Sequence, residues 1–255
     1  MKKIVFSFDD GRKDTFDTSL SILKKYGFVA TINIATDFIL NPALYDCFAS
    51  GNGEAMTIEE VVDTQRRGFE IASHGHKHTN TVEDCLQSLA ELNKWGVDTS
   101  KIGFASPFSK LTDKNMLGFD SLLNKELLYI RSGRQVRREG LFYSGLYFLM
   151  ERLKSNYLFY LLNKKMIYRT NDTRFVYGIT VTKRTNFKQI QYLINKMPDN
   201  SAIILIFHSV LDKNQPGYGK DKWFYNKEHF IKLCDYISST PNVSVVTTKE
   251  LFDGQ

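Results

Sequence analysis

Apolar runs alternate with amphipathic segments along almost the whole chain. Several of the runs are short and rich in β-branched or aromatic residues, which is typical of fully buried strands. We expect strands at residues 4–9, 29–35, 69–73, 102–106, 127–131, 175–182, 202–208 and 243–247. Apolar residues at helical spacing predict helices at 15–26, 187–197 and 227–239, and Thr57 followed by Glu60 predicts a capping box. This alternation predicts βαβ units and a parallel sheet.

Length and composition favour one large α/β unit. The chain has 255 residues, 42% of them hydrophobic, and α/β barrels of this size commonly form one domain. No internal repeat, low-complexity segment or linker rich in proline and glycine marks a boundary. We therefore predict a single catalytic domain over residues 1–255.

Cysteine usage and the N-terminus bear on the compartment. Cys47, Cys85 and Cys234 are scattered and odd in number, which favours a reducing environment over a disulfide framework. The apolar run after Met1 and two lysines ends after five residues, too short for a signal peptide, and no uncharged stretch approaches a membrane span of about 20 residues. We expect a cytoplasmic protein.

Three of the five histidines lie within five residues, at His74, His76 and His78, directly after a predicted strand. Neutral imidazoles are good donors for divalent transition metals, and on a helical turn the rings of His74 and His78 would converge. Asp9 and Asp10, at the end of the first apolar run, offer a carboxylate for the metal and another to move a proton. A polar turn with a helix cap is the alternative for the aspartates.

Polar and titratable residues recur where predicted strands end. They are Asp9 and Asp10 at the first strand, His74 and His78 after the third, Pro107 and Phe108 after the fourth, Arg131 at the fifth and His208 at the seventh. In a (β/α) barrel the carboxyl ends of the strands meet at one mouth, where catalytic groups gather. A barrel of seven or eight mostly parallel strands therefore predicts one shared site.

The ordered motifs resemble those of the polysaccharide deacetylases, the NodB-homology carbohydrate esterases. FSFDDG (6–11), EIASHGHKH (70–78), GFASPF (103–108) and ILIFHS (204–209) are similar to the first, second, third and last motifs of that family. The resemblance implies a distorted barrel holding one divalent metal, usually zinc, on Asp10, His74 and His78. It also implies Asp9 as catalytic base and His208 as catalytic acid in removing acetyl groups from sugars.

Several positions depart from the family pattern. Gly75 and Thr79 change the loop between and after the metal histidines but leave the ligands in place. Ala105 stands where many members have an arginine that pairs with the base, and Arg131 is either its substitute or an ordinary surface arginine. Ile206 replaces a leucine expected to line the acetyl pocket. No Asp and Trp motif is found near His208, so its partner is not predicted.

The predicted groups fit amide hydrolysis. A divalent cation acidifies bound water and polarises a carbonyl, so Asp9 need only accept a proton from that water. A backbone N–H near Phe108, beside Pro107, is a candidate stabiliser of the oxyanion. His208 would protonate the leaving amine. His76 points away on a helical turn and is left out of the metal shell, and His229 is expected to be structural.

The net charge of +6 is concentrated in a predicted insertion at residues 134–169. Its eight basic residues against Glu139 and Glu151 are Arg134, Arg137, Arg138, Arg152, Lys154, Lys164, Lys165 and Arg169. The segment is also rich in aromatic residues, which suits an anionic sugar carrier or an acidic membrane face. A helical excursion covering the barrel or making a dimer contact is the alternative. No recognition motif accompanies the charge, which argues against nucleic acid as a partner.

Together these features predict a metal-dependent carbohydrate deacetylase, a hydrolase of the carbon–nitrogen bond of linear amides. The expected cofactor is one divalent ion, zinc first, with cobalt, manganese, nickel or iron as alternatives. The expected substrate is an N-acetylated sugar that is nucleotide-linked, lipid-diphosphate-linked or part of an oligosaccharide, used in surface-glycan biosynthesis, with possible contact to the inner membrane face through 134–169. Two alternatives are hydrolysis of another small amide and a barrel that binds glycan without turnover.

Overall fold

A computed structural model describes residues 1–45, 54–112, 114, 116, 118–123, 125–133, 140–168, 174–215, 217–219 and 223–252. Cys47 and the basic residues of 134–139 and Arg169 lie outside this described part. Among the described residues, no helix is long and apolar enough to cross a membrane.

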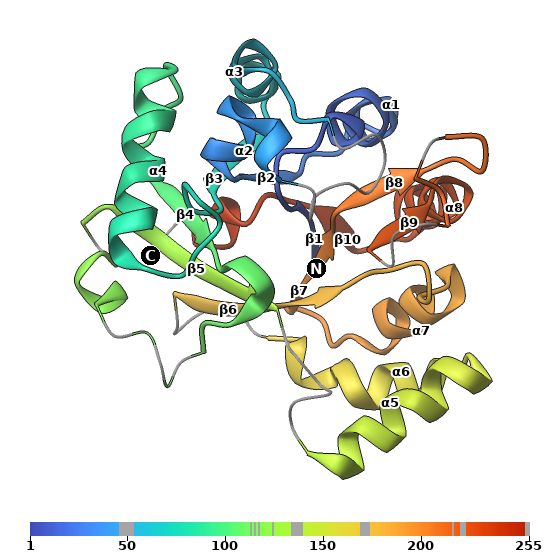
Figure 1. Ribbon diagram of the computed structural model, residues 1–255. Helices are drawn as coiled ribbons and strands as arrows, with labels where there is room; N and C mark the ends of the chain where they lie inside the picture. Colours follow the sequence, from blue (N-terminus) through green and yellow to red (C-terminus); the bar gives the residue numbers. More distant parts are fainter. Residues whose placement is uncertain are drawn as a thin grey trace.

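Seven parallel strands close into a barrel, because β7 pairs back onto β1 (Figure 1). They are β1 (Lys2–Phe8), β2 (Thr31–Ile34), β3 (Glu70–Ser73), β4 (Ile102–Ala105), β5 (Leu127–Gly133), β6 (Phe175–Thr180) and β7 (Ala202–Phe207). β10 (Val243–Val245) pairs with the first half of β1, whereas β2 pairs with its last two residues. The predicted barrel is confirmed, and each predicted strand is found within a few residues of its expected bounds.

Helices surround the barrel. They are α1 (Ser21–Lys25), α2 (Thr36–Leu40), α3 (Ile58–Arg66), α4 (Val82–Lys94), α5 (Leu141–Leu153), α6 (Asn156–Asn163), α7 (Phe187–Lys196) and α8 (Lys227–Ser239). The predicted capping box of Thr57 and Glu60 begins α3. The helix expected at 15–26 is a π-helical turn, η1 (Thr15–Leu20), followed by α1.

Short elements complete the chain. The 3₁₀ turns are η2 (Pro42–Leu44), η4 (Pro107–Ser109), η5 (Phe119–Ser121), η7 (Lys164–Met166) and η8 (Lys249–Leu251). A small two-stranded sheet of β8 (Ser209–Leu211) and β9 (Phe224–Asn226) follows β7 and was not predicted.

Alternate side chains of the strands face the helices and the barrel interior. On the outer side, Phe6, Phe8 and Phe207 each make a T-shaped contact with Phe230 of α8. On the inner side, Val5, Ile204, Ile206 and Tyr129 belong to a separate buried cluster. The interior is therefore filled, and any reaction must take place at a mouth of the barrel.

Strand register brings the carboxyl ends to one level. Phe8 is the register partner of Phe207, and the Asp9 N–H donates to the Phe207 carbonyl at 2.9 Å. Ser73 pairs with Ile34, whose carbonyl accepts from the His74 N–H at 2.8 Å. The residues that follow these strands consequently share one rim.

Candidate metal and catalytic site

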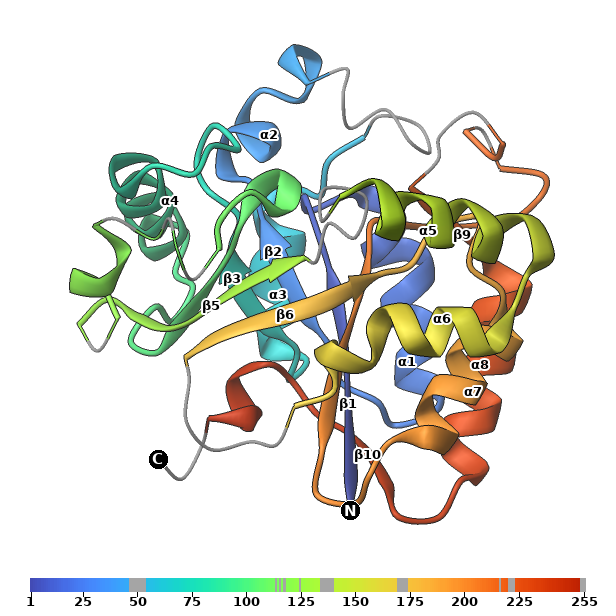
Figure 2. The same ribbon diagram turned by 90° about the horizontal axis from the view of Figure 1, so that it is seen from below.

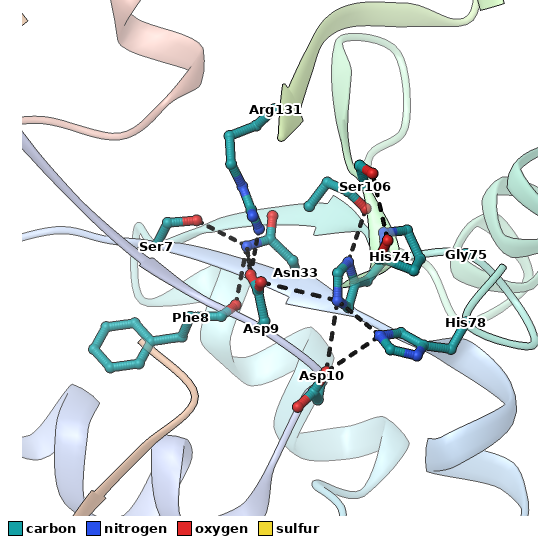
Figure 3. Close-up of polar contacts among 12 residues, drawn as sticks. Ser7, Phe8, Asp9, Asp10, Asn33, His74, Gly75, His78, Ser106 and Arg131 are labelled. Carbon is teal, nitrogen blue, oxygen red and sulfur yellow. Dashed lines mark hydrogen bonds and ion pairs between the residues drawn. The ribbon is translucent and has the colours of Figure 1, made fainter. Parts of the chain in front are cut away.

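Asp10, His74 and His78 form a three-residue group at this rim (Figure 3). One ligand atom of each lies within 4.8 Å of the others, and all three residues are buried. Asp10 Oδ1 is 3.5 Å from His74 Nε2 and 3.6 Å from His78 Nε2, and the two imidazole nitrogens are 3.1 Å apart. One carboxylate oxygen and two nitrogens thus converge on a single point, as the donor set of a divalent transition metal requires.

The protonation of the two histidines fits metal binding. His74 Nδ1 lies 2.8 Å from the Ala105 carbonyl, a contact that places the proton on Nδ1 and leaves the Nε2 lone pair for a metal. Burial and the neighbouring His74 lower the pKa of His78 to about 3, so its ring stays neutral. The group therefore presents the Nε2 atom of His74, the neutral ring of His78 and one carboxylate to a cation.

Backbone conformation at the rim is unusual. Within the described part, seven non-glycine residues have positive φ, and Asp10 (81°), His78 (57°), Phe108 (54°) and Ser109 (52°) are four of them. Such conformations cost about 1–3 kcal/mol each and cluster at functional sites. His74 and His78 lie in a loop and not on the helical turn that was expected. That expectation was wrong in its geometry, since the left-handed conformation of His78 brings the rings together without a helix.

Asp9 lies beside the metal group and is held by two partners. Its Oδ1 accepts from Arg131 Nη2 and from Asn33 Nδ2, the latter at 2.8 Å, while Oδ2 is 3.9 Å from His74 Nε2. Burial raises the pKa of Asp9, but Arg131 and then His74 and His208 outweigh it, and the pKa lies below its ordinary value. Asp9 is therefore an anion with one oxygen fixed and the other turned toward the metal group (Figure 3).

The Arg131 guanidinium reaches Asp9 from β5. Arg131 is buried and is the register partner of Ala105 on β4. Ala105 has a side chain too small to reach Asp9, and Arg131 of the adjacent strand contacts the Asp9 carboxylate instead. The structure thus rules out the alternative in which Arg131 is an ordinary surface arginine.

Arg12 holds the other side of the metal aspartate. Its Nε and Nη2 both lie 2.7 Å from Asp10 Oδ2, and Nη1 is 3.4 Å from Ser209 Oγ. Burial raises the pKa of Asp10, but Arg12, followed by His74, outweighs it and holds that pKa well below its usual range. Oδ2 is thereby committed to Arg12, which leaves Oδ1 for the two histidines.

His208 lies directly after β7. Its Nδ1 is buried and has no hydrogen-bond partner among the described residues, and its ring centre is 5.3 Å from that of Trp223. Burial lowers the pKa of His208, although Asp10 and Asp9 act in the opposite direction. Trp223 thus supplies an aromatic contact to the predicted acid histidine.

Three other predicted site residues, Phe108, Pro107 and Ile206, differ from one another in exposure and contacts. Phe108 is exposed at the rim, and its ring centre is 4.5 Å from that of His78. Pro107 is buried, and its carbonyl accepts from Asn80 Nδ2 at 2.9 Å. Ile206 is buried among the inner cluster. Their predicted roles in holding substrate or an oxyanion stay predictions.

Besides His208, two histidines lie outside the metal group, as expected from the sequence. His76 turns toward α2, with Nδ1 at 2.9 Å from Thr36 Oγ1 and Nε2 at 4.0 Å from Asp37 Oδ1. His229 lies in the first turn of α8, where its N–H donates to the Asn226 side chain that caps the helix.

Three contacts of the site were missed from the sequence. Arg12 directly follows the Asp-Asp-Gly turn, and its charge beside two carboxylates is a signal that was present. Asn33 lies in a predicted strand, where an isolated polar residue is also informative. The sequence before Trp223 shows no hydrophobic periodicity, so no local pattern connects Trp223 with His208.

Comparison with known proteins confirms the family resemblance. Residues 1–114 match the family model described as polysaccharide deacetylase. No curated protein sequence matches the chain.

Solved structures share the fold. A family 4 acetyl xylan esterase from Clostridium thermocellum in complex with a cobalt ion is 15% identical, with 98% of this chain and 90% of that chain covered and a TM-score of 0.53. The peptidoglycan deacetylase PdaC from Bacillus subtilis is 14% identical over 98% and 89%, with a TM-score of 0.51. A 4-alpha-glucanotransferase from Thermococcus litoralis is 13% identical over 100% of this chain and 40% of that one, with a TM-score of 0.54. These likenesses establish a common fold.

Proposed function

We propose that this chain, whose first 114 residues match the polysaccharide deacetylase family, is a metal-dependent hydrolase that removes an N-acetyl group from a sugar. One observation carries the proposal. The Asp10, His74 and His78 group lies directly beside the buried pair of Asp9 and Arg131, at the mouth of a filled barrel. A metal site adjoining an ionised carboxylate is the arrangement that hydrolysis by an activated water requires.

Asp10, His74 and His78 would hold the metal. When bound, a divalent cation polarises the acetyl carbonyl and lowers the pKa of water from about 16 towards 7. We assign Zn²⁺ first, because two imidazoles and one carboxylate form a common catalytic zinc set that leaves a coordination position open. Cobalt, manganese, nickel and iron are the alternatives.

Asp9 acts as the base in this proposal. Arg131 and Asn33 hold Oδ1, so Oδ2 is the oxygen that accepts the proton of the attacking water. The lowered pKa of Asp9 keeps it ionised at neutral pH. A weakly basic carboxylate suffices, since the water it deprotonates is already acidified.

His208 acts as the acid. An amine leaves an amide only when it is protonated, whereas an alkoxide leaving from an acetyl ester needs less assistance. His208 directly follows Phe207 of β7, and the charges of Asp10 and Asp9 act on it, which supports this role. This requirement favours an N-acetyl over an O-acetyl substrate.

Release of acetate tests the proposal. The purified chain should release acetate from at least one member of a panel of N-acetylated sugars, comprising free N-acetylhexosamines, nucleotide sugars, chitin oligosaccharides and lipid-linked sugars. A chelator should abolish the reaction and added Zn²⁺ should restore it. The Asp9→Asn variant should retain the metal and lose about 10²–10⁴ in rate. Full activity in Asp9→Asn would contradict the assigned base, and metal-independent turnover would contradict the assigned chemistry.

The panel also decides between biological settings. Activity on nucleotide-linked or lipid-linked sugars would support the proposed role in surface-glycan biosynthesis. Stoichiometric metal with acetate release only from small non-sugar amides would instead support a hydrolase of another amide on the same fold.

A further inference from the structure

A stripe of large apolar side chains is exposed on helix α5 and continues to the first turn of α6. Six of the twelve large apolar side chains that are exposed in the described part lie between residues 141 and 157. They are Leu141, Phe142, Phe148, Leu149, Leu153 and Tyr157. Phe142 and Phe148 expose 73% and 63% of their surface. A cluster of this kind marks an interaction surface, whereas single exposed apolar residues do not.

The packing of α5 explains why this stripe faces outward. α6 packs its buried Phe159 and Leu162 into the main core, and α5 lies outside α6, with Met150 turned inward. Leu141, Phe148 and Leu149 are exposed on the other side of α5, and no helix or strand of the described residues lies over that side (Figure 1). We call this outer side of α5 the α5 face.

Basic side chains border the α5 face. Arg152, in the last turn of α5, and Lys154, the C-cap of that helix, are exposed, and Glu151 is the single acidic residue between positions 140 and 168. Glu151 is paired with Arg184 at 2.6 Å, so it adds no exposed negative charge of its own. The surroundings of the apolar stripe are consequently cationic.

The α5 face lies on the same side of the molecule as the metal group. Lys154 donates to the Arg184 carbonyl at 2.9 Å, and Arg184 belongs to the loop that follows the carboxyl end of β6. Figure 2 shows α5 level with the carboxyl ends of the strands and α6 beneath it. Anything bound to the α5 face therefore lies beside the barrel mouth.

We propose that the α5 face docks on an anionic membrane surface. A helix of 13 residues is about 20 Å long, which suits a helix lying in the interface and is too short to span it. Aromatic and leucine side chains enter the boundary of the acyl chains, while the bordering Arg152 and Lys154 contact acidic headgroups. A second copy of the chain fits less well, because a two-fold contact places the same basic residues against one another. This docking is independent of the proposed reaction.

Sedimentation with lipid vesicles tests the docking. The full chain should bind vesicles of phosphatidylcholine mixed with phosphatidylglycerol, bind vesicles of phosphatidylcholine alone more weakly, and lose affinity as salt is raised. The variant Phe148→Ser with Leu149→Ser keeps the net charge and should lower the partition coefficient by about tenfold or more. Leu86→Ser is the matched control, since Leu86 on α4 is 40% exposed and Leu149 is 41% exposed.

Charge and oligomeric state are tested separately. Arg152→Gln with Lys154→Gln should weaken binding to the anionic vesicles by several fold and leave binding to neutral vesicles unchanged. The proposal is overturned if the wild-type chain ignores the anionic vesicles or if the Phe148 and Leu149 variant binds them like the Leu86 control. It is likewise overturned if light scattering finds a dimer that the Phe148 and Leu149 variant converts to a monomer.

Discussion

Replacing Arg131 by glutamine should move the acid limb of the pH–rate profile to higher pH. Arg131 and Asp9 are both buried, and the guanidinium is the largest of the charges that lower the pKa of Asp9. Glutamine retains a hydrogen-bond donor but removes the positive charge. Asp9 is then left with Asn33 as a neutral partner, and its protonated form becomes more favourable.

The expected shift follows from burial and contact. An opposite charge in contact with a carboxylate lowers its pKa by about 1–3 units, so Arg131→Gln should raise the pKa of Asp9 by about that amount. Removing one partner of a buried ion pair also destabilises a protein by about 3–5 kcal/mol. Arg131→Lys keeps the charge but loses the planar fork, so it should give a smaller shift. Asn33→Ala removes a neutral hydrogen bond to the same oxygen and should also give a smaller shift.

The assay is kcat/KM for acetate release between acidic and neutral pH, with the metal content of each variant measured in parallel. The pKa of the acid limb should rise in all three variants. The rise should be largest in Arg131→Gln and smaller in Arg131→Lys and Asn33→Ala. An acid limb that stays in place in Arg131→Gln, while the metal is retained, would refute the assignment of that limb to Asp9 and of Arg131 to its support.

Three further predictions concern other groups of the site. Arg12→Ala frees the second oxygen of Asp10 and should weaken Zn²⁺ binding by about 10–100-fold in a competition titration, and unchanged affinity would contradict the role given to Arg12. Burial raises the pKa of Asp14 to about 7 from an ordinary value of 3.8. Between these pH values the folded state therefore binds more protons than the unfolded state. The free energy of unfolding of the metal-free chain should fall by about 2–4 kcal/mol as the pH rises through this window. Asp14→Asn should remove that fall, measured as the free energy of unfolding in urea titrations at pH 5 and 8. An equal change of this free energy with pH in both proteins would contradict the role given to Asp14. His208→Ala should keep the metal and lose about 10²–10⁴ in kcat on an N-acetylated sugar. A variant with the wild-type kcat would show that His208 is not the acid.

The strands could be predicted because their signal is local. AIILIF at 202–207 and IVFSF at 4–8 are apolar runs that reveal burial without knowledge of any partner. The barrel then follows from their alternation with helices. The small sheet of β8 and β9 was missed because each strand has three residues and depends on pairing between distant segments.

The site was only partly predictable, for a related reason. His74, His78 and one of the two neighbouring aspartates could be proposed from residue type and position, since carboxyl ends of parallel strands meet at one edge, and the resemblance to the family motifs singled out Asp10. The helical turn expected for His74 and His78 was wrong, because this segment is a loop in which His78 adopts a left-handed backbone conformation. The contacts of Arg12 with Asp10 and of Trp223 with His208 depend on the same kind of loop geometry.

The proposed chemistry depends on the binding of one metal ion by Asp10, His74 and His78. Isothermal titration of the metal-free chain with Zn²⁺, together with elemental analysis of the loaded protein, measures this directly. We expect one ion per chain, with binding lost in Asp10→Ala and in His78→Ala but retained in His76→Ala, whose ring faces α2. Unchanged stoichiometry and affinity in Asp10→Ala, or a loss of binding in His76→Ala alone, would contradict this expectation.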